Sequence, residues 1–370
     1  MPRQPQSSDR LLIGLLIGLS LFGLIVLLSA SGAVSFQYYS DPLYFVRRQI
    51  FLGLLPGGLV FLLISRMDYR KLKPYAFPLL ALSVVLLLLV FIPGLGSRVG
   101  GSQSWIKIAG FTLQPSEFVK FTFLLYSASW LSTKGVEDKL KASMPYFAAI
   151  GTIMFLLVIQ PDTGTMSIIV MTAMLMYFAA GAPLLWFVGA GLIGTALVGI
   201  LIAIAPYRAA RFMTFLHPEL DPLGIGYHIN QAFLAIGSGG LFGLGFGQSR
   251  QKYLYLPEVQ GDSVFAVMAE ELGFVMTLIF LAAMALLVWK CFQVARNASD
   301  TFGRFIAIGV GTWIAVQTFA NVASMTGLMP ITGVTLPFVS YGNSAMVSLF
   351  AGLGLIASVS RMGNIHGVRP

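Results

Sequence analysis

The chain has 370 residues, of which 57% are hydrophobic and only 10% are charged. Because soluble proteins carry about 25% charged residues, this composition excludes a soluble protein and indicates a polytopic membrane protein. The net charge of +9 is explained by basic residues in cytoplasmic loops, so we expect no nucleic-acid partner. The single cysteine, Cys291, excludes an intrachain disulfide, and three histidines with one cysteine argue against a zinc site.

Ten apolar stretches follow one another along the chain, each of about the length that a membrane-spanning helix needs. We expect helices, because a lone segment in lipid must satisfy its own backbone hydrogen bonds. The sequence therefore predicts an all-α fold, with about ten transmembrane helices in a single domain over residues 1–370. The predicted spans are residues 11–31, 49–65, 75–93, 116–132, 145–160, 163–181, 184–206, 263–288, 305–325 and 343–360.

An even number of spans places both termini on one side of the membrane. If that side is the cytoplasm, the inner segments carry 14 lysines and arginines and the outer segments carry 9, as the positive-inside rule favours. Nine of the fourteen acidic residues then lie outside or at outer helix ends. This excess indicates a site that faces the cell exterior, although ordinary solvation at headgroup level is an alternative.

The outer segment before the fourth span contains Trp105 and then Gln114-Pro115-Ser116-Glu117. Glu117 and Lys120 are three residues apart, so they share one face of a helix. An unpaired cation at that depth would cost roughly 2.5–3.5 kcal/mol. Either the two side chains neutralise each other, or Lys120 is held ready for an anion.

The longest loop, residues 207–262, is predicted to be extracytoplasmic between the seventh and eighth spans. Loops of this length are usually functional or disordered. Its glycine-rich run at residues 237–247 indicates tight turns and close backbone approach, and could cradle a phosphate through backbone N–H groups. Arg208 and Arg211, three residues apart, could bind phosphate with their guanidinium groups or anchor the loop at lipid phosphates.

Asp262 stands where the eighth span begins. As a helix N-cap it would contribute roughly 1 kcal/mol; as a carboxylate at the membrane boundary it is also a candidate for catalysis. Glu270 and Glu271 lie two turns deeper and point in different directions around a helix. At most one of them can join Asp262, and the other is expected to face a neighbouring helix.

Taken together, these segments resemble the SEDS family, the FtsW/RodA/SpoVE group of bacterial cell-wall proteins. Details around residues 247–258 are closer to the FtsW branch than to RodA. The matching segments are Arg47-Arg48-Gln49, Trp105, Gln114-Pro115-Ser116-Glu117 with Lys120, Gln160-Pro161-Asp162-Thr163-Gly164-Thr165, Tyr207-Arg208 with Arg211, Asp221-Pro222, Gly226-Tyr227, Ala235-Ile236-Gly237-Ser238-Gly239-Gly240, Gln251-Lys252 with Tyr255-Leu256-Pro257-Glu258, Asp262, Phe265-Ala266-Val267, Glu270-Glu271-Leu272-Gly273, Leu336-Pro337-Phe338 and Ser340-Tyr341-Gly342.

The sequence departs from the family pattern in three places. Ser104 precedes Trp105 where the family often has an arginine. The common His-Thr-Asp-Phe appears as Gln260-Gly261-Asp262-Ser263, and the usual Gly-Gly-Ser after Ser-Tyr appears as Gly342-Asn343-Ser344. The acid is kept while its neighbours differ, so the family's substrate contacts transfer less directly than the aspartate.

The resemblance implies a peptidoglycan glycosyltransferase of the bacterial cytoplasmic membrane. Such an enzyme polymerises lipid II into glycan strands at the outer face and releases undecaprenyl diphosphate, for cell division or cell shape. Lipid II, the nascent glycan strand and membrane lipids would be its partners, together with a class B penicillin-binding protein. Both termini would be cytoplasmic and the active site extracytoplasmic.

The expected site follows from this chemistry. Asp262 is predicted to be the catalytic base that takes a proton from the attacking sugar hydroxyl. Cations would stabilise the leaving diphosphate, and Mg²⁺ or Mn²⁺ held by an acid such as Glu117 is a possible cofactor. A lipid II flippase and a non-catalytic scaffold are the alternative functions. The predicted substrate-binding residues are Trp105, Gln114, Glu117, Lys120, Arg208, Arg211, Lys252, Glu258 and Ser340.

Overall fold

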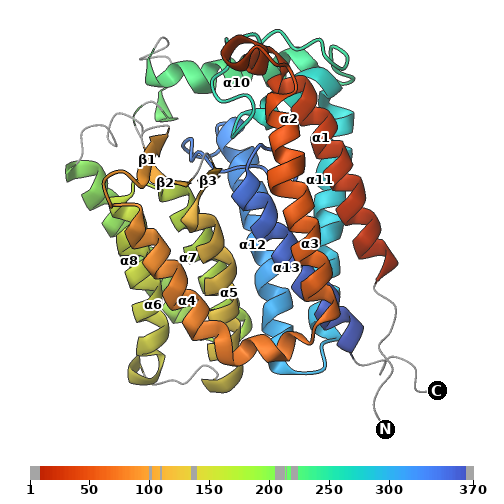
Figure 1. Cartoon of the computed structure of the whole chain (residues 1–370). Coiled ribbons are helices and arrows are strands. Elements are labelled where there is room, and N and C mark those ends of the chain that lie inside the picture. Colours follow the sequence, from red (N-terminus) through yellow and green to blue (C-terminus); the bar gives the residue numbers. More distant parts are fainter. Residues whose placement is uncertain are drawn as a thin grey trace.

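Helices occupy all ten predicted spans in the computed structural model, which describes residues 9–99, 102–108, 111–134, 140–204, 213, 215–217 and 224–363. They stand side by side as a bundle (Figure 1). The helices at the predicted spans are α1 (Arg10–Tyr39), α3 (Leu55–Arg66), α4 (Ala76–Leu89), α5 (Pro115–Lys134), α6 (Leu140–Ile159), α7 (Thr163–Ala179), α8 (Leu184–Ile204), α11 (Val264–Arg296), α12 (Thr301–Met325) and α13 (Asn343–Met362).

Two of these helices are extended by other helical turns. The short helix α2 (Tyr44–Arg48) and a π-helical segment, Gln49–Leu54, lead into α3, so that one apolar helix runs over Tyr44–Arg66. A 3-10 segment, Tyr69–Tyr75, leads into α4 in the same way. Both extensions add to the length available for crossing a membrane.

Six described helices are long and apolar enough to cross a membrane: Arg10–Tyr39, Tyr44–Arg66, Tyr69–Leu89, Val264–Arg296, Thr301–Met325 and Asn343–Met362. Two shorter apolar helices, Ser143–Ile159 and Thr163–Ala179, accompany them. The structure thus confirms a mostly helical protein with apolar spans, while the count of ten crossings stays a prediction.

A small antiparallel sheet was not predicted, so the expectation of an all-α fold is wrong between α4 and α5. Its strands are β1 (Gly96–Val99), β2 (Ser102–Ile108) and β3 (Phe111–Leu113), in that order. Along β2 the buried Ser104 and Ile106 alternate with the more exposed Trp105 and Lys107, which is the two-residue period of a half-buried strand. The sheet lies at the end of the bundle where the site is found (Figure 1).

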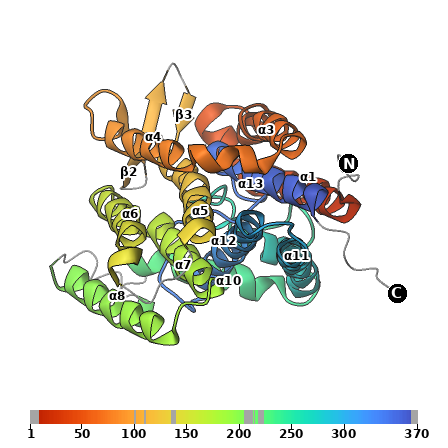
Figure 2. The same ribbon diagram turned by 90° about the horizontal axis from the view of Figure 1, so that it is seen from below.

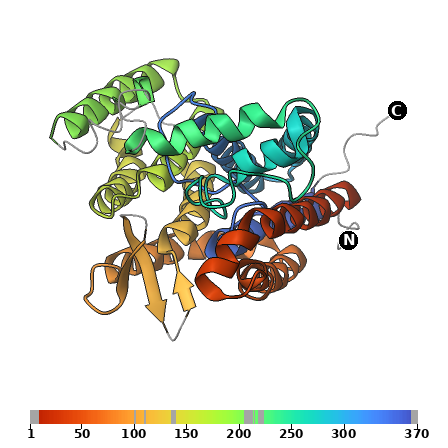
Figure 3. The ribbon, with the colours of Figure 1, turned by 90° about the horizontal axis from the view of Figure 1, so that it is seen from above.

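The region predicted as a long loop contains the helix α10 (Ile225–Gly239), which lies across that same end of the bundle (Figures 1 and 3). Arg208 and Arg211 lie outside the described residues. The core is built on α12 and α13, which are the most buried of the long apolar helices. Seen from below, α12 is surrounded by α5, α7, α11 and α13 (Figure 2).

Candidate active site

Asp262 lies in the turn that precedes α11, at the end of the bundle covered by α10. Its side chain is largely buried, with 9% of the residue surface exposed. The amide of Asn321, on α12, donates hydrogen bonds to the backbone carbonyls of Asp262, at 2.8 Å, and Val334, at 2.7 Å. The most buried part of the bundle therefore fixes the position of this carboxylate.

Asp262 does not occupy the N-cap position of the following helix. α11 begins at Val264, its N-cap residue is Ser263, and no side chain makes a capping hydrogen bond there. The Ser263 hydroxyl instead donates to the carbonyl of Pro257 at 2.6 Å and lies 2.6 Å from Nε2 of His228, on α10. The capping interpretation of Asp262 is therefore wrong.

Ser340 holds the Asp262 turn from the other side. Its hydroxyl donates to the carbonyl of Gly261 at 2.6 Å and accepts from the backbone N–H of Leu336 at 2.7 Å. The next residue, Tyr341, donates its backbone N–H to the carbonyl of Gln260 at 2.7 Å. The predicted substrate residue Ser340 is thus engaged within the protein, where it joins the segment before α13 to the Asp262 turn.

Glu258 stands on the same turn in a left-handed backbone conformation, with φ of 49°. Its carboxylate accepts a hydrogen bond from the Gln260 side chain at 2.9 Å and keeps solvent-exposed surface. Partial removal from water and then the negative charge of Asp262 raise the pKa of Glu258, while His228 lowers it in part. The turn therefore presents two mutually repelling carboxylates.

Lys120 and Glu117 form an ion pair near the N-terminal end of α5. The Lys120 Nζ lies 2.8 Å from a Glu117 carboxylate oxygen, and both side chains are buried. The ammonium also donates to Gln317 Oε1 at 2.9 Å and lies 5.4 Å from the centre of the Trp313 ring. The pairing expected from the i,i+3 spacing is present, and Lys120 is neutralised within the protein.

A recess lies beside this ion pair. Its volume is about 10 Å³, roughly the space that one water molecule needs, and its lining includes Trp313, Gln317, Thr335 and Ser340. Because Gln317 contacts Lys120 and Ser340 contacts the Asp262 turn, the recess joins two predicted parts of the site. Sequence reasoning missed α12: its two amides, Gln317 and Asn321, are four residues apart and so share one helix face.

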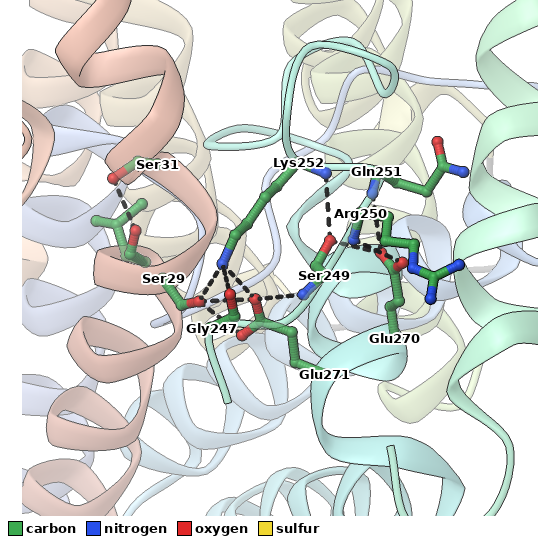
Figure 4. A network of polar contacts seen from close by, with 10 residues as sticks. Ser29, Ser31, Gly247, Ser249, Arg250, Gln251, Lys252, Glu270 and Glu271 are labelled. Carbon is green, nitrogen blue, oxygen red and sulfur yellow. Dashed lines mark hydrogen bonds and ion pairs between the residues drawn. The ribbon is translucent and has the colours of Figure 1, made fainter. Parts of the chain in front are cut away.

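Lys252 belongs to a second buried network (Figure 4). Its ammonium lies 2.8 Å from a carboxylate oxygen of Glu271, and it also donates to the Ser29 hydroxyl at 3.1 Å and to the Gly247 carbonyl at 2.8 Å. Ser29, on α1, donates in turn to both carboxylate oxygens of Glu271. The predicted anion binder Lys252 is therefore neutralised, and it ties the loop to α1 and α11.

Glu270 holds the same loop from its other side. Its carboxylate accepts hydrogen bonds from the Ser249 hydroxyl and from the backbone N–H groups of Arg250, at 2.9 Å, and Gln251, at 3.4 Å (Figure 4). Glu270 and Glu271 both bind residues 247–252. Neither contact reaches the Asp262 turn, so the idea that one of them joins Asp262 finds no support here.

The glycine-rich segment is paired with a break in α11. Gly273 has φ of 73°, and the N–H groups of Phe274 and Val275 donate to the carbonyls of residues 240 and 241. In the other direction, the N–H groups of Leu244 and Gly245 donate to the carbonyls of residues 270 and 271, at 3.0 Å each. The expected close backbone approach is confirmed. These two N–H groups serve α11, so they are not available to cradle a phosphate.

The remaining predicted residues stand at the edges of the site. Trp105 lies half-buried on β2, paired across the strands with Ser97. Gln114 precedes α5, where its N–H donates to the Ser344 hydroxyl at 3.1 Å and its carbonyl accepts from the N–H of Glu117. The structure thus connects the β3–α5 junction to the start of α13.

Few described side chains could hold the Mg²⁺ or Mn²⁺ ion that the sequence analysis considered. Within the described part of the chain, no group of three or more histidine, cysteine, aspartate or glutamate side chains is arranged to hold a metal ion. Glu117 is engaged with Lys120, which does not suit the ligand role predicted for it. Glu258 and Asp262 remain as a carboxylate pair, and Mg²⁺ is often held by one or two carboxylates together with substrate phosphates.

Comparison with known proteins gives a consistent picture. The sequence profile of the FtsW/RodA/SpoVE family, described as cell cycle proteins, matches residues 9–365. A probable peptidoglycan glycosyltransferase FtsW of Trichlorobacter lovleyi is 38% identical over 95% of this chain and 93% of its own length. The stage V sporulation protein E of Bacillus subtilis is 39% identical over 98% of this chain and 99% of its own length.

Solved structures agree with these relatives. A chain from a peptidoglycan synthase complex that coordinates polymerization and crosslinking superposes with a TM-score of 0.79, at 28% identity, covering 96% of this chain and 98% of the other. The rod shape determining protein RodA of Thermus thermophilus superposes with a TM-score of 0.71, also at 28% identity, covering 96% and 97%. The chain therefore belongs to the FtsW/RodA/SpoVE family and is FtsW-like.

Proposed function

We propose that this protein, an enzyme of the peptidoglycan glycosyltransferase family, polymerises lipid II into glycan strands and uses Asp262 as its general base. The observation that carries the proposal is a buried carboxylate whose turn is held by α12 and by the segment before α13. A base fixed in this way keeps its geometry while a substrate binds. The relatives named as peptidoglycan glycosyltransferases FtsW supply the reaction class.

The reaction requires one proton transfer and one displacement. Asp262 accepts the proton of the acceptor sugar's 4-hydroxyl as the oxygen attacks C1 of the donor sugar. The bond between C1 and the diphosphate oxygen breaks, and undecaprenyl diphosphate leaves with the bonding electron pair. Direct attack inverts the anomeric carbon. A Mg²⁺ or Mn²⁺ ion, if bound by Glu258 and Asp262, would supply neutralisation of the diphosphate charge.

The arrangement of the chain supports an extracytoplasmic site. The start of α1 and the end of α13 lie at one end of the bundle, and α10 and the sheet lie at the other (Figure 1). We therefore place both termini in the cytoplasm, the site at the outer face of the bacterial cytoplasmic membrane, and ten crossings between them. The excess of basic residues in the inner segments favours the same orientation.

A class B penicillin-binding protein is the partner we propose. The similarity to a chain from a synthase complex that coordinates polymerization and crosslinking supports this pairing. Crosslinking is the task of the transpeptidase, so the polymerase would hand its strand to that partner.

One assay separates the candidate functions. Purified protein is given labelled lipid-linked disaccharide in detergent, and products are resolved on a gel, while a parallel sample in vesicles is tested for movement of the lipid across the bilayer. The proposal predicts glycan polymer in detergent. Transbilayer movement without polymer would identify a flippase, and the absence of both activities would identify a scaffold. Either of these results would contradict the proposal.

A further inference from the structure

Arg48 is a cation that is linked by contacts to the Asp262 turn. It has no part in the proton transfer or the displacement of the proposed reaction. It ends α2, which lies at the same end of the bundle as α10 (Figure 1). Its guanidinium donates from Nη1 to the Tyr44 hydroxyl at 2.9 Å, lies 5.5 Å from the centre of the Tyr44 ring, and also interacts with the Tyr341 hydroxyl. These contacts orient the guanidinium, and none of them is with an anionic side chain.

Arg47, Lys120 and Lys252 differ from Arg48 in this respect. Arg47 forms an ion pair with Asp41, Lys120 with Glu117, and Lys252 with Glu271. Within the described part of the chain, no carboxylate is paired with Arg48. A cation at the membrane boundary is more stable when an anion accompanies it, so Arg48 is suited to an anion that the protein itself does not supply.

Two polar atoms in this cluster also lack partners among the described residues. They are Arg48 Nε, a donor, and Asn343 Oδ1, an acceptor, and both are buried. The Asn343 amide nitrogen donates to the Tyr341 hydroxyl at 3.2 Å, so both orphaned groups surround one tyrosine. A buried polar atom without a partner is costly, and a ligand that brings hydrogen-bonding oxygens would relieve that cost.

The cluster is joined directly to the catalytic turn. The side chain of Gln49, next to Arg48, donates to the Ser340 carbonyl at 3.3 Å and accepts from the Gly342 N–H at 3.0 Å. Ser340 and Tyr341 hydrogen-bond the carbonyls of the two residues before Asp262. The ring of Phe45, on α2, packs against that of Tyr341 with centroids 4.9 Å apart. One continuous set of contacts therefore runs from Arg48 to Asp262.

We propose that Arg48, with Tyr341 and Asn343, forms a subsite for the phosphate oxygens of a lipid. A guanidinium binds phosphate through paired N–H donors and suits it better than an ammonium. The lipid is either the diphosphate-linked substrate, which rests on the proposed function, or an ordinary phospholipid whose headgroup sits at the same depth. In both cases the phosphate supplies the charge that Arg48 lacks.

The adjacent arginines offer a matched pair for the test. Arg48→Ala removes the cation without a carboxylate partner, whereas Arg47→Ala removes a cation whose side chain is 60% exposed and paired with Asp41. Asn343→Asp is the second variant, because a carboxylate in the first turn of α13 favours the helix but repels a phosphate. Arg48→Lys keeps the charge and loses the fork.

Binding is measured directly in maltoside micelles free of phospholipid, with fluorescent undecaprenyl diphosphate as the probe and undecaprenol as the phosphate-free control. We expect Arg48→Ala and Asn343→Asp to weaken binding of the diphosphate by about tenfold or more, Arg48→Lys to fall between, and Arg47→Ala to stay within about twofold. Melting temperatures are recorded alongside, so that misfolding of Arg48→Ala is recognised. If that variant misfolds, the binding measured with Asn343→Asp tests the subsite.

Competition with phosphatidylglycerol distinguishes the two sources. Displacement of the probe by a modest excess of phosphatidylglycerol from the parent, but not from Arg48→Ala, assigns the subsite to phospholipid headgroups. Resistance to it assigns the subsite to the lipid-linked diphosphate. If both Arg48→Ala and Asn343→Asp bind the diphosphate and phosphatidylglycerol as the parent does, the subsite does not exist. Because binding is read without turnover, this result is separate from a failure to form polymer, which would refute the proposed function instead.

Discussion

Removing one partner of the buried Lys252–Glu271 ion pair is expected to destabilise the protein strongly. The charged atoms are 2.8 Å apart and the side chains are 6% and 4% exposed. At an effective dielectric constant of about 20 their attraction is about 6 kcal/mol, and much of it offsets the desolvation of both groups. Glu271→Gln leaves an ammonium buried without its counter-charge, for which about 3–5 kcal/mol is typical. The Ser29 hydroxyl and the Gly247 carbonyl, which still accept from Lys252, favour the lower end of that range.

Thermal unfolding of the purified protein in detergent measures this cost. The matched control is Arg70→Met, because the Arg70–Asp300 pair has the same 2.8 Å separation but its side chains are 49% and 32% exposed, and exposed pairs contribute about 0–1 kcal/mol. Glu271→Gln should lower the melting temperature by several degrees more than Arg70→Met. Lys252→Met combined with Glu271→Gln should recover most of the loss, since no unpaired charge remains buried. Equal losses for both single variants would refute the reasoning.

Three further predictions concern the loop before α11. Gly243→Ala should lower the melting temperature more than Gly247→Ala, because both glycines have φ near 80° but only at Gly243 would the new Cβ meet a carbonyl oxygen, at 2.1 Å; equal effects would contradict the packing. Asp262→Asn should lower the pKa of Glu258 as followed by infrared titration of the carboxylates, because burial still raises that pKa but the neighbouring negative charge no longer does; an unchanged or higher pKa would oppose it. A cysteine at the exposed Tyr255, with Cys291 removed, should react with an impermeant thiol reagent on intact spheroplasts, and labelling only after lysis would reverse the orientation.

The helices could be predicted from the sequence because apolar length is a strong signal. Their ends and breaks could not. α1 continues to Tyr39 and α11 to Arg296, beyond the apolar stretches, because polar residues can extend a helix past the hydrocarbon. The break at Gly273 depends on pairing with residues 240–245, and a single glycine in an apolar run does not indicate such a partner. The strand β2 has only seven residues, and so short a segment gives too weak an alternating pattern for a strand to be predicted.

Local spacing also explains which parts of the site could be predicted. Glu117 and Lys120 are three residues apart, and their pairing followed from helix geometry. Lys252 could not be assigned in the same way, because its contact with Ser29 joins residues 223 positions apart. A lysine that ends in a buried ion pair and a lysine that awaits an anion look alike in a sequence. Only the fold shows which charges are already neutralised.

The role of Asp262 as general base is tested most directly by the polymerisation rate of the Asp262→Asn variant. Asparagine keeps the size of the side chain, and the backbone carbonyl of this residue can still accept from Asn321, so the melting temperature should not change. An amide cannot take up the proton, and general base catalysis contributes about 10²–10⁴ in rate. We predict a loss of that order in polymer formation from labelled lipid-linked disaccharide. Polymerisation within a few-fold of the parent, at an unchanged melting temperature, would remove Asp262 from the mechanism.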